Sequence, residues 1–165
     1  MLDTVVRMFT RRDPRREAAS ALTRIMNRHD VIRLSYEDGV FVDRRGRNEK
    51  HVAMGVWLFP CAADPEKFGI RVGDGVPAVT HDMRPNGFGI MTPMRLQHHE
   101  YAVAVQDEDD SWKFFRCKVR HNTRKPGGWY HLGMEVERVL SPTPAEQTAF
   151  HQHVQALQLE SDSMD

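Results

Sequence analysis

The sequence predicts a mainly β protein, an antiparallel barrel or sandwich with one helix before the strands and one after them. Six segments with a β pattern, each bounded by glycine, proline or an acidic turn, fall within roughly 90 residues. This spacing suits antiparallel strands and leaves no room for the crossover helices of a parallel sheet. A length of 165 residues with 40% hydrophobic content is typical of one domain that buries its own core.

The first helix is predicted over residues 13–29. Asp13 can cap it, Pro14 suits its first turn, and apolar residues recur at a spacing of three to four. The apolar face consists of Ala18, Leu22, Ile25 and Met26. The opposite face carries Arg15, Arg16, Glu17 and Arg24. That charged face is either a solvated surface or a partner-binding surface.

The strands are predicted from alternating β-branched and aromatic residues between turn signals. The six segments are 51–59, 78–83, 87–93, 100–107, 112–121 and 129–140. Ahead of them, residues 31–36 and 40–43 read as a short hairpin around the Asp-Gly pair at 38–39.

The last helix is predicted from a capping box. Thr143 and Glu146 stand three residues apart around Pro144, which suits the first helical position. An apolar stripe that should pack on the β domain follows: Phe150, Val154 and Leu157. We therefore divide the chain into an extension of helix and hairpin or linker (1–43), the β domain with its helix (44–160) and a polar tail (161–165).

Composition excludes several function classes. Twenty-three basic and 23 acidic residues cancel, so no net field draws the chain to DNA or to an anionic membrane. No apolar run reaches the length of about 18 residues that spans a bilayer, and the start has no signal-peptide core. Cys61 and Cys117 lie far apart without a CxxC partner, which predicts buried thiols rather than a zinc knuckle or a disulfide. We expect a cytoplasmic protein without a membrane span.

Catalytic and metal motifs are not evident. His98 and His99 are adjacent and point to opposite sides of a strand, while His151 and His153 diverge on a helix, so neither pair converges on one ion. No serine lies in a G-x-S-x-G elbow, and phosphate-loop and dinucleotide fingerprints are missing. We expect no enzyme activity, no cofactor and no metal site.

Two polar stretches point to a ligand instead. "VFVDRRGRNEKH" places arginines and a histidine just before a strand: Arg44, Arg45, Arg47 and His51. Arginine presents a planar fork of donors for phosphate oxygens and for the edge of guanine. "THDMRPNGFGIMTP" carries Asp82, Arg84, Gly87 and Gly89, an acid that can accept from a base edge beside glycines that allow close approach.

Together these stretches resemble the PilZ domain family, in which an RxxxR loop and a [D/N]xSxxG turn stand on a six-stranded antiparallel barrel ending in a helix. The resemblance covers roughly residues 44–157. "DMRPNG" matches the second motif except that Arg84 replaces the serine. Residues 117–136 resemble the family's late hairpin, with "VRH", a Gly-Gly turn and "YHLG".

The resemblance implies a receptor for the bacterial messenger cyclic di-GMP that acts on a downstream protein partner. Arg44, Arg45 and Arg47 would grip phosphates and guanine, Asp82 would read a guanine edge, and Gly87 would permit close approach. Arg47 and His51 have the RxxxR spacing, so histidine replaces the second arginine unless Arg44 or Arg45 does its work.

Arg84 would either add a phosphate contact or fill the space of a guanine. The alternative to a receptor is a divergent PilZ-like domain that binds no nucleotide and serves as a protein-interaction module. The sequence also leaves open a homodimer.

Overall fold

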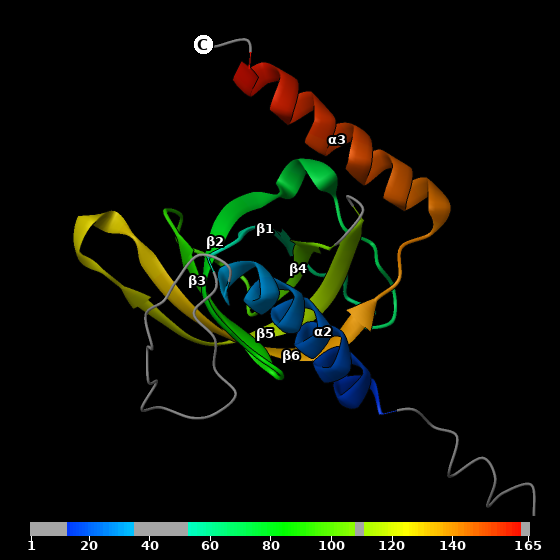
Figure 1. Cartoon of the computed structure of the whole chain (residues 1–165). Helices are drawn as coiled ribbons and strands as arrows, with labels where there is room; N and C mark the ends of the chain where they lie inside the picture. Colours follow the sequence, from blue (N-terminus) through cyan, green and yellow to red (C-terminus); the bar gives the residue numbers. More distant parts are fainter. Residues whose placement is uncertain (1–12, 35–52, 108–110, 163–165) are drawn as a thin grey trace, which may run out of the picture.

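The strands form a closed antiparallel barrel. A computed structural model describes residues 13–34, 53–107 and 111–162. The strands are β1 (Gly55–Pro60), β2 (Val76–Arg84), β3 (Gly87–Thr92), β4 (Glu100–Gln106), β5 (Trp112–Arg124) and β6 (Tyr130–Leu140). They pair in the order β1-β2-β3-β6-β5-β4, and β4 pairs with β1 to close the barrel (Figure 1). The predicted mainly-β architecture is confirmed, and so is the six-stranded antiparallel barrel that the family resemblance implies.

The barrel interior is filled by alternate residues of every strand. Val56 and Leu58 of β1, for example, point inward, whereas Trp57 and Phe59 point outward. Helix α2 (Pro14–Leu34) lies across the barrel and packs on β6 and β2 (Figure 1). Its apolar face joins the inner core through Ala18, Leu22, Ile25 and Met26, as predicted. The helix therefore completes the core of the barrel.

A second core lies on the outer surface of β1, β4 and β5. Helix α3 (Pro144–Asp162) covers it, and Phe150 is fully buried against the rings of Phe59, Trp112 and Phe114. The helix starts at the predicted capping box: Glu146 N–H donates to Thr143 Oγ1 at 3.3 Å, and Thr143 N–H donates to the Glu146 carboxylate at 2.8 Å. Beyond Val154, which packs on this core, the helix extends away from the barrel (Figure 1).

The first helix is longer than predicted. It continues to Leu34 instead of ending near residue 29, so the strand expected from Val31 is wrong over residues 31–34. A β-branched valine and isoleucine favour a strand locally, but the helix extends through them. The rest of the expected hairpin, residues 35–43, lies outside the described residues. No helix in the described ranges is long and apolar enough to cross a membrane.

Candidate functional site

The stretch from Asp82 to Gly89 forms a hairpin, in which only Pro85 and Asn86 belong to the turn. Arg84 is the last residue of β2 and pairs with Gly87, the first residue of β3. Asp82 pairs with Gly89, two residues further along each strand. The acid, the arginine and the glycines are therefore held in a fixed register on the barrel wall.

Both glycines are explained by contacts within the barrel. A Cβ atom on Gly87 would lie well inside 3.0 Å of the Met134 carbonyl oxygen of β6. A Cβ atom on Gly89 would meet the Asp82 carboxylate, which covers that glycine. Neither position has room for a side chain, because a neighbouring strand or the acid already occupies the space. The close approach of a ligand to Gly87, which the sequence suggested, stays a prediction.

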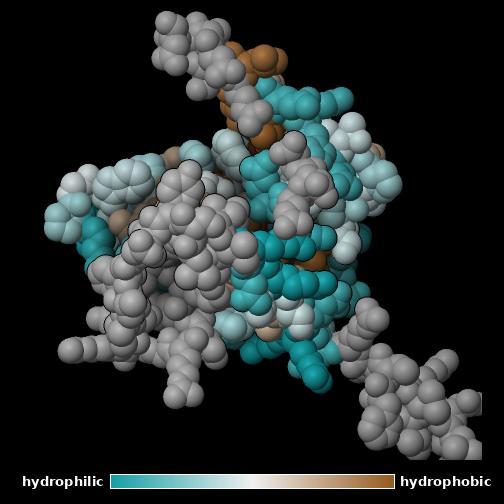
Figure 2. Space-filling view, viewed as in Figure 1, coloured by the Kyte–Doolittle hydropathy of each residue, from teal (hydrophilic) through white to brown (hydrophobic). Residues whose placement is uncertain are grey.

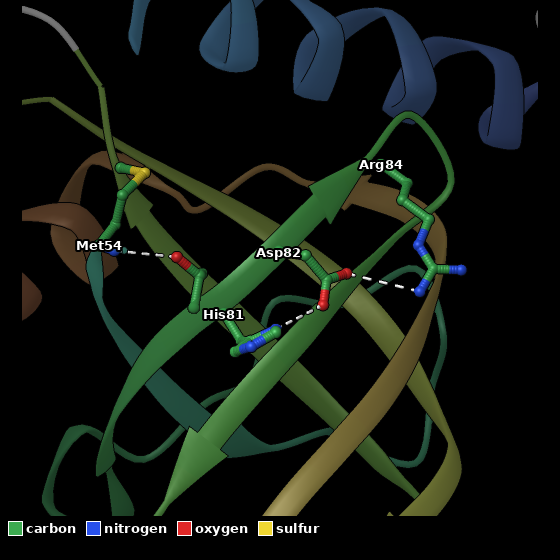
Figure 3. A network of polar contacts seen from close by, with 5 residues as sticks. Met54, His81, Asp82 and Arg84 are labelled. Atoms are coloured by element: carbon green, nitrogen blue, oxygen red, sulfur yellow. Dashed lines mark hydrogen bonds and ion pairs between the residues drawn. The ribbon is translucent and has the colours of Figure 1, made fainter. Parts of the chain in front are cut away.

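Asp82 is a buried acid with a partner at each oxygen. Its side chain is only 5% exposed; Oδ2 lies 3.0 Å from His81 Nδ1, and Oδ1 lies 3.5 Å from Arg84 Nη2. Figure 3 shows the carboxylate between these two side chains, which are both about half exposed. Nearby, Thr80 Oγ1 accepts a hydrogen bond from Met54 N–H at 2.9 Å and ties β2 to the start of β1. The acid is fixed in place, while its partners reach the surface.

Three histidines cluster near this acid on the outer face of the barrel. The ring centroids of His81 and His131 are 5.4 Å apart, and those of His121 and His131 are 5.6 Å apart. They come from β2, β5 and β6, and the His121 ring lies over Gly133. Sequence reasoning missed this cluster, because it compared only histidines adjacent in sequence and could not know which strands pair.

The environment keeps His131 neutral. Burial lowers the pKa of its imidazole, and the neighbouring His81 and His121 lower it further, whereas the Asp82 carboxylate opposes the shift. Its Nε2 atom is buried and has no hydrogen-bond partner in the described part of the chain. A neutral imidazole keeps a lone pair on one ring nitrogen, so His131 can act as an acceptor or a ligand.

The predicted site residues divide into two groups. Asp82, Arg84 and Gly87 lie together on β2 and β3. Arg44, Arg45, Arg47 and His51 lie outside the described residues, so their expected position beside Asp82 stays a prediction.

The cysteines are poor candidates for a catalytic nucleophile. Both are free, as predicted; Cys117 is fully buried and Cys61 partly so. Burial raises the pKa of the Cys61 thiol to about 11, although the Arg116 guanidinium partly offsets the shift. A thiol with this pKa is almost entirely protonated at neutral pH and is a weak nucleophile.

Comparisons with known proteins give a similar solved structure but no family. No family model matches the chain. No curated protein matches it either. Among solved structures the chain is similar to the Bacillus subtilis inhibitor of motility MotI/DgrA, with 12% sequence identity and a TM-score of 0.42 over 76% of this chain. The match spans 56% of that protein, so the chain corresponds to little more than half of its length.

Proposed function

We propose that this chain is a non-catalytic regulatory domain that binds cyclic di-GMP on the outer face of β2 and β3 and acts on a protein partner. The observation that carries the proposal is the pairing of Asp82 with Arg84 on that face, where the Arg84 side chain is 52% exposed. An acid and an arginine at fixed register offer the two chemistries that a guanine nucleotide needs. The PilZ resemblance supplies the identity of the nucleotide.

The roles follow from the donors and acceptors of each group. The Asp82 carboxylate is an acceptor only, and it suits the N–H groups on the edge of guanine. The Arg84 guanidinium is a donor only, and it suits a phosphate oxygen. The imidazole faces of His81 and His131 lie beside them and can stack on a base. Arg44, Arg45 and Arg47 would add further phosphate contacts.

Binding at this site requires an exchange of partners. Arg84 holds Asp82 at 3.5 Å, which is long for a charge-assisted hydrogen bond. A phosphate that draws the guanidinium away would expose one carboxylate oxygen to the guanine. Because residues 44–47 carry the other arginines of the motif, we expect them to contribute most of the remaining phosphate contacts.

Calorimetric titration of the full chain with cyclic di-GMP tests the proposal. Arg84→Ala should weaken binding by about 1.5 to 3 kcal/mol, which is roughly tenfold or more, and the loss should shrink in high salt. Arg71→Ala is the matched control, because Arg71 is 88% exposed, pairs with Asp74 and immediately precedes the short helix η1 (Val72–Asp74), which packs against α3. Equal losses of affinity for cyclic di-GMP in both variants, or no binding by the wild-type chain, would overturn the receptor proposal.

One observation favours the alternative, a PilZ-like interaction module without nucleotide. Both oxygens of Asp82 already have partners, and the carboxylate is almost fully buried. In that case Arg84 closes the site, the wild-type chain binds no cyclic di-GMP, and Arg84→Ser gains binding because it restores the serine of the family motif. The outward face of α2, which is hydrophilic in Figure 2, would then be the surface for a partner.

A further inference from the structure

We propose that His81, Asp82 and His131 form a binding site for a divalent transition-metal ion of the zinc class. Each residue offers one ligand atom, and these atoms all lie within 4.8 Å of one another. His81 and Asp82 come from β2, and His131 comes from β6, which is joined to β2 through β3. Three ligands therefore meet on the outer barrel face from two strands that are not paired directly.

The ligand set matches the chemistry of zinc. Two imidazoles and one carboxylate are a common set of three protein ligands, with a water molecule in the fourth position. Ligand atoms around a tetrahedral zinc ion lie about 3.3 Å apart, since each bond is about 2.0 Å long. The cluster must therefore close by a rotation, which His81 can make because its side chain is 54% exposed.

Two further features suit these groups to a metal. His131 has a buried Nε2 atom without a partner among the described residues, and a metal would compensate such a buried polar atom. Asp82 directs Oδ2 toward His81, while Oδ1 contacts Arg84. A contact of this kind at the second oxygen is what orients carboxylate ligands in metalloproteins.

The test is a titration of the untagged, chelator-treated full chain with zinc, and separately with cobalt, whose visible absorption reports tetrahedral coordination. We expect one zinc ion per chain, and no binding of magnesium, which prefers oxygen ligands. His131→Gln and His81→Ala should each weaken zinc binding by at least about tenfold. His99→Ala is the control, because its imidazole is exposed and lies outside the cluster.

The outcomes distinguish a metal site from a His–Asp pair that only stabilises the fold. A metal-free melting temperature for each variant shows whether it is folded, and His81→Ala serves as the informative variant if His131→Gln is not. No zinc binding by the wild-type chain, or equal losses in His81→Ala and His99→Ala, would overturn the inference. The titration contains no nucleotide, so metal binding and cyclic di-GMP binding can each fail alone.

Discussion

Replacing Gly87 with alanine tests whether this glycine serves the barrel or a ligand. The added Cβ would lie inside 3.0 Å of the Met134 carbonyl oxygen, a backbone atom of β6. Met134 is held in register opposite Phe88, so the oxygen can move only if the two strands separate locally. Overpacking costs typically about 1 to 3 kcal/mol, and a clash with backbone belongs at the upper end. We expect Gly87→Ala to lower the free energy of unfolding by about 3 kcal/mol.

Two companion variants set the scale. A Cβ on Gly55 of β1 would meet nothing within 4 Å, so Gly55→Ala should change stability by less than about 1 kcal/mol and is the control. A Cβ on Gly89 would meet the Asp82 carboxylate, which can rotate away at the loss of its two contacts. Gly89→Ala should therefore cost about 1 to 2 kcal/mol. Combined with Asp82→Ala, the same change should cost much less, because the clash is gone.

Urea unfolding followed by tryptophan fluorescence measures these differences, with unchanged m-values as the sign of a two-state comparison. The reasoning fails if Gly87→Ala is as stable as Gly55→Ala. The reasoning on Gly89 fails if Gly89→Ala lowers the free energy of unfolding equally with and without the Asp82 side chain. A stable Gly87→Ala that has lost cyclic di-GMP binding would instead assign this glycine to the ligand.

Three more predictions concern the outer core, a buried thiol and the shared acid. Phe150→Ala should cost about 3 kcal/mol in urea unfolding, whereas Leu159→Ala on the same helix, 70% exposed, should cost almost nothing. The pKa of Cys61 is raised from 9.0 to about 11, so its thiol stabilises the fold below pH 9, and this contribution is lost as pH rises toward 11. The melting temperature of Cys61→Ala should therefore fall less than that of the wild-type chain between pH 9 and pH 11. If both proposals hold, zinc and cyclic di-GMP should weaken each other's binding equally in calorimetry, because both require Asp82.

Local signals predicted most of the fold. Alternation located all six strands to within a few residues, and the Thr143–Glu146 box located the start of α3, because alternation within a strand and capping involve residues close in sequence. The short segment from Val31 was predicted wrongly, because a few β-branched residues do not outweigh the continuation of a long helix. In the sequence, closure into a six-stranded barrel follows only from the family resemblance. The structure confirms it through the pairing of β4 with β1, which are about 45 residues apart.

Only part of the candidate site could be predicted from residues that are close in sequence. The motif placed Asp82, Arg84 and Gly87 together, because they are close in sequence. It gave no sign of His131 and His121, which reach the same face through the pairing of β3 with β6 and of β6 with β5. The apolar stripe predicted for α3 is also only partly buried. Phe150 is buried, the later residues of the stripe are half-buried, and Figure 2 shows apolar surface near the free end of the helix.

A bulge in β2 accounts for the arrangement of His81 and Asp82. Simple alternation places adjacent residues on opposite faces of a strand, so one of the two would point into the barrel. The register shifts between Thr80, which pairs with Ile90, and Asp82, which pairs with Gly89. His81 is the extra residue, and both side chains consequently lie on the outer face. This inserted residue brings an imidazole and a carboxylate within 3.0 Å, and both the nucleotide site and the metal site that we propose depend on it.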